Sequence, residues 1–478
     1  MDTQPSTGIA PAAGDPSQPA CTWWADSILY HIYPLGFLSA PPENRLDQPV
    51  EHRLDALHDW LDHFCALGIT CLQIGPLCQS LTHGYDVVDY RTVDRRLGDA
   101  GSFRRLVDAC HARGLRVILD GVFNHTSREF FAFRDVHAHR RSSRFADWYH
   151  LDPNGNSAFN DGFAYQSWEG HQNLPRLNLL NRELREHIFE AACYWLTEMN
   201  VDGWRLDVAH EIDPFFWRQF AEACRSARHD CLLLAEAIHG DYRRLVGPEL
   251  LDTATNYQLS KALWSSLNDR NYFELAHVIQ RDQQLYRGLR LVSFLGNHDL
   301  SRIRSQLTRE AHYFPAIIAL LTGEHVPALY YGDECGMEGQ KTDGDAALRR
   351  PMPRPDAWWP DEQRARFRET ARLCEIRREH PVLRHGSYEL AGNTHTSFTV
   401  VRRLADQTAV ICLNSADTPA RVELDARRFG LPDGLELEDA LEPLRRFTIA
   451  DGRLIIEPVW PNWGRILLPV VHHTGTPG

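Results

Sequence analysis

From about residue 28, short apolar runs alternate with longer segments in which apolar residues recur every three or four positions. The short runs predict buried strands and the longer spacing predicts amphipathic helices. Eight strand candidates arise, at residues 28–33, 69–74, 115–119, 201–206, 231–235, 253–256, 291–295 and 326–331, and we expect a helix after each. Eight β-α repeats predict an α/β fold, a (β/α)8 TIM barrel. A doubly wound open sheet is the alternative, but no glycine-rich phosphate loop follows the first strand.

Two stretches depart from this alternation. Residues 126–173, after the third strand, are polar and aromatic with turn signals, and they predict an inserted loop domain. Beyond residue 381, short alternating strands separated by turn residues predict an antiparallel β domain. We therefore expect a barrel over 21–125 and 174–380, an inserted B domain over 126–173 and a C-terminal β-sandwich over 381–478. Residues 1–20 are rich in Pro, Ala, Ser and Gly and predict a disordered lead.

The amino-acid composition limits the classes of binding partner and the location expected for the protein. The net charge of −13 and the pI near 6.0 argue against nucleic acid and anionic membranes, because both need basic patches. No apolar run approaches the roughly 20 residues that a membrane-spanning helix needs. The 11 cysteines are scattered without a Cys-x-x-Cys pair. This pattern predicts reduced core thiols and a cytoplasmic location, and it makes a zinc site or a disulfide framework improbable.

The chemistry begins with residues 201–207, Val-Asp-Gly-Trp-Arg-Leu-Asp. Gly203 would allow a close approach of two backbones in a buried strand. Arg205 lies two residues before Asp207, so in an extended strand both side chains point to the same face. A permanent cation beside Asp207 would hold that carboxylate ionised. Taken alone, this stretch favours a structural ion pair at a strand end, and the other strand ends change that interpretation.

Three further strand ends carry polar groups: Asp120 to His125, Glu236, and Asn297-His298-Asp299. Each has an alternative interpretation as a strand-end polar residue or a helix cap. In (β/α)8 barrels, however, reactive groups gather at the carboxyl ends of the strands. Several carboxylates at one barrel mouth push their pKa values apart, as a nucleophile and a proton donor require.

These motifs, at residues 120–125, 203–207, 235–236 and 294–299, resemble the alpha-amylase superfamily of glycoside hydrolases. Supporting stretches at 68–76, 83–86, 174–178 and 328–334 appear in the order typical of that family, and the resemblance runs from about residue 23 to 469.

The resemblance implies a retaining mechanism in which Asp207 is the nucleophile and Glu236 is the general acid/base. Asp299 would bind sugar hydroxyls and favour a distorted ring. The substrate-binding residues implied with them are Tyr85, which would stack beneath the sugar, and Arg205, His125, His298, His210 and His239. A surface loop histidine is the alternative interpretation of His239. No cofactor is required by these roles. Asn124 matches a calcium-ligand position of the family, but His210-Glu211 departs from the usual pattern, so calcium is doubtful.

Leu174-Pro175-Arg176-Leu177-Asn178 and Glu211 resemble the cyclomaltodextrinase, neopullulanase and maltogenic amylase subgroup. The short polar N-terminal segment is a departure from that subgroup, because this segment cannot supply the subgroup's N-terminal β domain. Thr82 stands where strict alpha-glucosidases often have an aspartate. We therefore expect a glycosidase that cleaves mainly alpha-1,4 bonds in malto-oligosaccharides or cyclodextrins, with an alpha-glucan oligosaccharide as its partner. A 4-alpha-glucanotransferase is the open alternative, and an alpha-glucosidase or a non-catalytic barrel are weaker ones. No oligomeric state is predicted.

Overall fold

Eight parallel strands form one sheet in the computed structural model, which describes residues 23–354 and 359–470. Their order is β10-β9-β8-β5-β2-β1-β12-β11. Their bounds are β1 (Leu29–Ile32), β2 (Cys71–Pro76), β5 (Arg116–Gly121), β8 (Gly203–Leu206), β9 (Leu232–Ala235), β10 (Thr253–Ala254), β11 (Val292–Phe294) and β12 (Val326–Tyr330). A parallel bridge between Thr255 and Val292 joins the two ends of this order. The predicted (β/α)8 barrel is thus confirmed.

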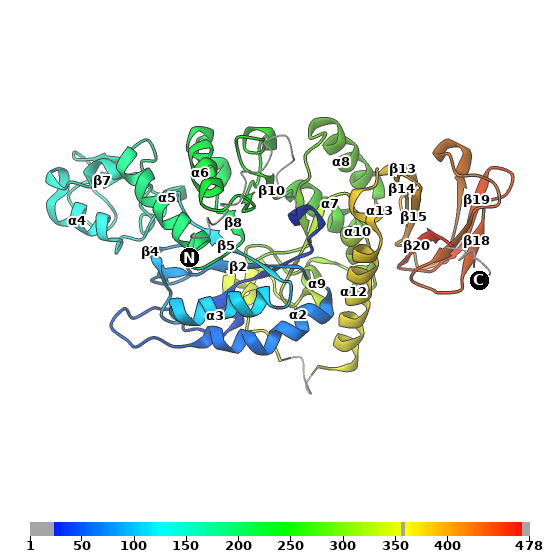
Figure 1. The fold of residues 1–478 in the computed structure, drawn as a ribbon, viewed down its shortest axis with the longest axis horizontal. Coiled ribbons are helices and arrows are strands. Elements are labelled where there is room, and N and C mark those ends of the chain that lie inside the picture. The colour runs from blue at the N-terminus through cyan, green and yellow to red at the C-terminus, as the bar shows by residue number, and fades with distance from the viewer. Residues whose placement is uncertain (1–22, 355–358, 471–478) are drawn as a thin grey trace, which may run out of the picture.

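The helices of the barrel lie in the intervals between its strands and after the last strand, β12 (Figure 1). The longer ones are α2 (Leu61–Leu67), α3 (Ala100–His111), α5 (Arg182–Thr197), α6 (Pro214–Ala227), α7 (Tyr257–Asn268), α8 (Tyr272–Leu285), α10 (Tyr313–Thr322) and α12 (Asp361–Glu379). The shorter ones are α1 (Pro34–Phe37), α9 (Ile303–Gln306) and α11 (Asp345–Leu348). Polar side chains cap the N-termini of several helices. Asp99 and Ser102 form a capping box at α3, and the Asn256 side chain accepts a hydrogen bond from the Leu259 N–H at α7.

Two intervals differ from the sequence prediction. The interval between β9 and β10 contains a short 3-10 turn, η7 (Tyr242–Arg244), where a helix was expected, so that prediction was wrong. The interval between β10 and β11 contains a second helix, α8, that the sequence did not reveal. Only Tyr272, Leu275 and Ala276 of α8 are buried, so its apolar period is too sparse to recognise.

Gly203 is explained by the close approach of β8 and β9. The two strands pair with Gly203 opposite Leu232, and a Cβ on Gly203 would lie 2.1 Å from the Leu232 carbonyl oxygen. Any larger residue would separate the strands that carry the central polar residues of the barrel mouth.

Two further parts flank the barrel, at opposite ends of the molecule (Figure 1). The insert after β5 contains α4 (Phe131–His139) and the short pair β6 (Leu151–Asp152) and β7 (Ala164–Tyr165). Before it, β3 (Cys78–Ser80) and β4 (Val87–Val93) form a small antiparallel pair beyond the end of β2. The predicted position of the insert, after the third barrel strand, is confirmed.

The C-terminal part follows α13 (Pro381–His385) and is antiparallel, as predicted. Its larger sheet has the order β13-β14-β15-β20-β17-β18. The bounds are β13 (Glu389–Asn393), β14 (Ser397–Leu404), β15 (Gln407–Asn414), β17 (Glu436–Asp439), β18 (Arg446–Thr448) and β20 (Trp463–Pro469). A second sheet pairs β16 (Ala420–Asp425) with β19 (Arg453–Val459), and both sheets contribute to one apolar core. The domain limits drawn from the sequence stay predictions, and the expected lead at 1–20 lies outside the described residues.

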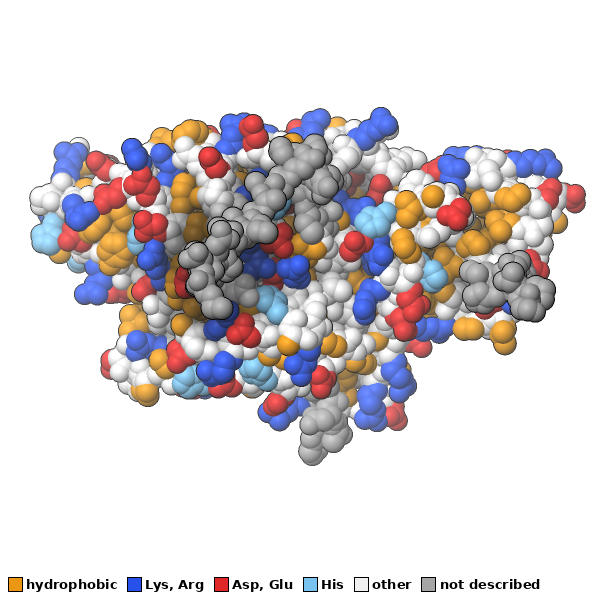
Figure 2. All heavy atoms as spheres, viewed as in Figure 1, with side chains coloured by type: hydrophobic (Ala, Val, Ile, Leu, Met, Phe, Trp, Pro, Cys, Tyr) orange, Lys and Arg blue, Asp and Glu red, His pale blue; other side chains and the backbone are white. Residues whose placement is uncertain are grey.

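The distribution of surface charge and the state of the cysteines agree with what the composition indicates. Acidic and basic side chains are interspersed over the face drawn in Figure 2. In the described ranges, no helix is both long enough and apolar enough to cross a membrane. Ten cysteines lie in these ranges, all of them free, and eight are buried.

Candidate active site

One buried guanidinium brings three strand ends together at the carboxyl end of the barrel. Arg205 Nη1 lies 2.6 Å from Asp120 Oδ1 and 2.9 Å from Asp207 Oδ1, and its Nη2 lies 2.5 Å from Glu236 Oε1. The backbone sets this geometry, because β5 and β8 pair with Asp120 opposite Arg205, and Glu236 N–H donates to the Leu206 carbonyl. The predicted contact between Arg205 and Asp207 is present, and the same arginine also contacts Glu236.

The residue after Asp207 has an uncommon backbone conformation. Val208 has φ 40° and ψ 40°, the left-handed region that a β-branched residue rarely adopts. Its N–H donates to Glu236 Oε2 at 2.9 Å. Strain of this kind persists only where surrounding contacts impose it, and it clusters at functional sites. The strained turn therefore links the two carboxylates that the sequence singled out.

A tyrosine completes the surroundings of Glu236. The Tyr257 hydroxyl donates to Glu236 Oε1 at 2.9 Å and accepts from Asn297 Nδ2 at 2.8 Å. Both oxygens of Glu236 thus accept from fixed donors, which holds the carboxylate in one orientation.

Asp299 is held by a second group of residues. His298 Nε2 lies 3.0 Å from Asp299 Oδ2, and Arg349 Nη2 lies 2.9 Å from Asp299 Oδ1. The His298 ring is stacked between Tyr33 and Tyr85, at centroid distances of 5.9 and 5.3 Å. The Asp299 side chain is 43% exposed, whereas those of Asp207 and Glu236 are 9% and 4% exposed. Asp299 therefore faces the open mouth and the other two carboxylates lie deeper.

The electrostatic surroundings push these carboxylates in opposite directions. Burial raises the pKa of Asp207 well above its ordinary value, with Glu236 and Asp120 adding to the rise and Arg205 opposing it. Burial also disfavours ionised Asp299, but His298 and Arg349 outweigh this effect and lower its pKa. The sequence prediction that Arg205 holds Asp207 ionised was therefore incomplete, because it left out burial and the two neighbouring carboxylates.

The remaining predicted residues lie in three places. The Tyr85 hydroxyl joins the central group, donating to Asp120 Oδ2 at 3.0 Å and lying 2.5 Å from His298 Nε2. His125 stacks on Trp168 of the insert at 5.6 Å, and burial lowers its pKa to about 3. His210 and His239 contact each other edge to face at 4.7 Å.

His210 Nδ1 lies 3.4 Å from the Glu236 carbonyl oxygen, and His239 is exposed. None of the contacts described for His125, His210 or His239 within the described residues is to a carboxylate of the central group. The sugar-binding role of these three histidines stays a prediction from the sequence.

Sequence reasoning missed Tyr257 and Arg349 as site residues, and it noted Asp120 without giving it a role. Asp120 stood inside a recognised motif, so a signal for it existed. Tyr257 is the first residue of a helix, and Arg349 follows a segment whose apolar residues show no helical or strand period. Neither position therefore carries a local signal of function. Their contacts with Glu236 and Asp299 depend on the closed barrel.

No metal-binding site can be identified among the described residues. Asn124, the calcium-ligand candidate, is 1% exposed and its amide nitrogen lies 3.4 Å from His125 Nδ1. Within the described ranges, no group of three or more His, Cys, Asp or Glu side chains is placed to hold a metal ion. Cofactor and calcium requirements stay predictions from the sequence, and no step below uses a metal.

Comparisons with known proteins agree with this geometry. The family model described as alpha amylase, catalytic domain, matches residues 31–373. A cyclomaltodextrinase of Thermoanaerobacter pseudethanolicus is 31% identical over 420 residues, which cover 82% of this chain and 71% of the relative. A neopullulanase 2 of Thermoactinomyces vulgaris is 32% identical over 436 residues, covering 85% and 72%.

Solved structures agree as well. The acarbose-soaked Nostoc punctiforme debranching enzyme has a TM-score of 0.79 at 28% identity, covering 94% of this chain and 99% of its own. The cyclic alpha-maltosyl-(1→6)-maltose hydrolase of Arthrobacter globiformis, in complex with that cyclic sugar, has a TM-score of 0.77 at 26% identity, covering 94% and 99%. With the family model matching more than half of its length, this chain belongs to the alpha-amylase family of glycoside hydrolases, whose members act on alpha-glucans.

Proposed function

We propose that this enzyme hydrolyses alpha-glucosidic bonds, mainly alpha-1,4, in malto-oligosaccharides or cyclodextrins by double displacement with retained configuration. The observation that carries the proposal is the position of Asp207 and Glu236 on one guanidinium, that of Arg205, at the barrel mouth. Two carboxylates on either side of a scissile bond are what retaining glycosidases use, and we expect their carboxyl groups to lie about 5–5.5 Å apart.

In the first step, an Asp207 carboxylate oxygen attacks the anomeric carbon. A bond forms between that oxygen and the anomeric carbon, the bond to the leaving oxygen breaks, and Glu236 donates its proton to that oxygen. In the second step, Glu236 takes a proton from water, the water oxygen attacks the same carbon, and Asp207 leaves. Two inversions restore the original configuration. Ionised Asp299, held by Arg349, would bind sugar hydroxyls and stabilise the cationic transition state.

The substrate preference rests on two supports. The motif at residues 174–178 resembles the cyclomaltodextrinase subgroup, and named relatives of that kind are 31% and 32% identical to this chain. Thr82 supplies no carboxylate at the rim, and its hydroxyl donates to Asp86 Oδ2 at 2.7 Å. Without an acidic clamp on the non-reducing end, we expect endo-type or ring-opening cleavage and not strict removal of terminal glucose.

A digestion panel tests this preference. The enzyme and its Asp207→Asn variant would be incubated with cyclodextrins, maltotriose, pullulan, starch, isomaltose, trehalose and sucrose, and the products separated by chromatography. We expect cyclodextrins and malto-oligosaccharides to be cleaved faster than starch, and the variant to be inactive on all of them. Activity on isomaltose or sucrose with none on alpha-1,4 chains would contradict the proposal. Longer products at high substrate would instead favour the glucanotransferase.

A further inference from the structure

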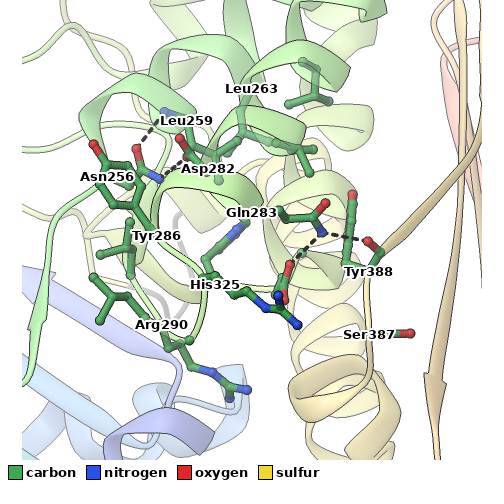
Figure 3. A pocket seen from close by; sticks show the side chains of 18 of the residues that line it. Asn256, Leu259, Leu263, Asp282, Gln283, Tyr286, Arg290, His325, Ser387 and Tyr388 are labelled. Atoms are coloured by element: carbon green, nitrogen blue, oxygen red, sulfur yellow. Dashed lines mark hydrogen bonds between the residues drawn. The ribbon is translucent and has the colours of Figure 1, made fainter. Parts of the chain in front are cut away.

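A cavity of about 330 Å³ lies between α7, α8, the end of α10 and the start of β13 (Figure 3). Leu291 and His325, which line it, immediately precede β11 and β12. The cavity is therefore at the amino end of the barrel, whereas Asp207 and Glu236 follow the carboxyl ends of their strands. Its volume is at the lower end of the range typical of small-molecule sites, about 300–1,000 Å³.

One side of the cavity is aliphatic. Leu259 and Leu263 come from α7, and Leu275 and Ile279 come from α8. Figure 3 shows Leu259 and Leu263 on one side of the cavity, with Asn256 and Asp282 close to Leu259, and Gln283 beside Tyr388. Burying a hydrocarbon chain against such a wall is favourable, by roughly 25 cal/mol per Å² of apolar surface removed from water.

The other side carries polar groups that the fold holds in place. Gln283 Nε2 donates to the Tyr388 carbonyl at 2.7 Å and to Glu324 Oε2 at 3.1 Å. Arg290 Nη1 donates to the Ala25 carbonyl at 3.0 Å and lies 3.3 Å from His385 Nδ1. Across the described ranges, Arg290 forms no ion pair with a carboxylate, and burial lowers its pKa, an effect that Asp26 and Glu324 oppose. Glu324 is exposed at the rim, where water screens its charge.

Two further arginines lie behind this end of the cavity, whose lining also includes the carboxylates Asp282, Glu324 and Glu389. Arg377 and Arg402 are fully buried, and among the described residues their guanidinium groups bond only to backbone carbonyls. Arg377 donates to the carbonyl of His325, and the Arg402 guanidinium lies over the Tyr388 ring at 5.4 Å. Burial lowers the pKa of Arg377, and Arg402 and Arg290 lower it further. Buried positive charge without a carboxylate partner is costly, and an anion would offset that cost.

We propose that this cavity binds a small amphipathic carboxylate, with its aliphatic chain against the α7 and α8 leucines and its head group facing Arg290. The aliphatic wall selects the chain and the unpaired arginine selects the anion. The site is separate from the barrel mouth, so this proposal does not depend on the sugar chemistry above.

Isothermal titration of the full-length protein with octanoate, octanol and butyrate tests it. We expect saturable binding of octanoate at one site. Octanol should bind at least about tenfold more weakly, because it lacks the charge that bonds to Arg290. Butyrate should also bind at least about tenfold more weakly, because it lacks most of the chain that packs on the aliphatic wall. The Asp207→Asn variant should bind octanoate as the parent does, since the barrel mouth is not involved.

Substitutions at three positions, Arg290, Ala319 and Arg287, assign the site. Arg290→Gln should weaken octanoate binding about tenfold and leave octanol binding unchanged, and Arg290→Lys should retain most of the affinity if the Gln variant is unstable. Ala319→Leu, which fills the cavity from α10, should abolish binding of both compounds without lowering the melting temperature. Arg287→Gln, an exposed rim arginine, is the matched control and should change affinity less than about twofold. Equal binding of octanol and octanoate, or full affinity in Arg290→Gln or Ala319→Leu, would overturn the proposal.

Discussion

Buried arginines lie at both ends of the barrel, but in opposite surroundings. At the carboxyl end, Arg205 contacts Asp120, Asp207 and Glu236. Burial lowers its pKa, but Asp120 and Glu236 outweigh burial and raise it above the ordinary value. Near the amino end, Arg402 bonds to five backbone carbonyls and, of the residues described, to no carboxylate, and burial lowers its pKa to about 10.

These different surroundings give the two buried arginines different roles. Arg205 organises acids that must exchange protons and form a covalent bond. Arg402, from β14, instead joins the C-terminal sheet to the barrel, because its carbonyl partners include Thr322 and Gly323 at the end of α10. Changes around Arg205 should therefore affect turnover, and changes around Arg402 should affect stability.

The largest effect is expected at the carboxyl end. Asp207→Asn should reduce kcat by about 10⁴-fold or more on every substrate, because an amide cannot form the glycosyl-enzyme. The substitution is nearly isosteric, so the melting temperature should change little. A variant that keeps a substantial fraction of kcat would remove Asp207 from the nucleophile role.

At the amino end, Arg402→Met should lower the free energy of unfolding by about 3 kcal/mol or more, because it leaves several buried carbonyls without donors. Thermal unfolding would measure the loss, and kcat at a temperature where the variant is folded should match the parent. A loss of kcat comparable to that of Asp207→Asn would show that the two ends are not independent.

Tyr257→Phe should lower kcat without changing stability, and by less than Asp207→Asn does. It removes one hydrogen bond to the Glu236 carboxylate, worth about 1.5 kcal/mol, so kcat should fall about tenfold. Initial rates on a malto-oligosaccharide would measure this fall. An unchanged kcat would mean that Arg205 and Val208 suffice to position Glu236.

The smallest change is a shift along the pH axis. Asp207 must be ionised to attack, and Asp120 is one of the charges that raise its pKa. Asp120→Asn removes that negative charge, so the pKa of Asp207 should fall and the acid limb of kcat/KM should move to lower pH. A shift to higher pH would mean that Asp120 acts mainly by orienting Arg205.

The sequence was a good guide where function and fold use local signals. The alternation of apolar runs predicted the eight strands, and Gly203 predicted the close approach of β8 and β9. Strand-end motifs pointed to Asp207, Glu236 and Asp299, which follow barrel strands in the structure, and their catalytic roles stay predictions. The helix α8 was missed because it buries few apolar residues. Tyr257 and Arg349 were missed because their partners lie 21 and 50 residues away in the chain and meet them only in the closed barrel.

The central claim is that Asp207 attacks the sugar and Glu236 moves the proton, and azide rescue tests it most directly. Glu236→Gln should be nearly as inactive as Asp207→Asn on natural sugars, but should still react with an alpha-glycosyl fluoride, whose leaving group needs no proton. Azide needs no general base, so it should speed this variant and give an alpha-glycosyl azide, identified by NMR. Asp207→Asn should give no retained azide product. Azide that takes the place of the missing Asp207 carboxylate would invert the anomeric carbon once, so a beta-azide is the only azide product expected from Asp207→Asn. A beta-azide from Glu236→Gln, or an alpha-azide from Asp207→Asn, would contradict the account.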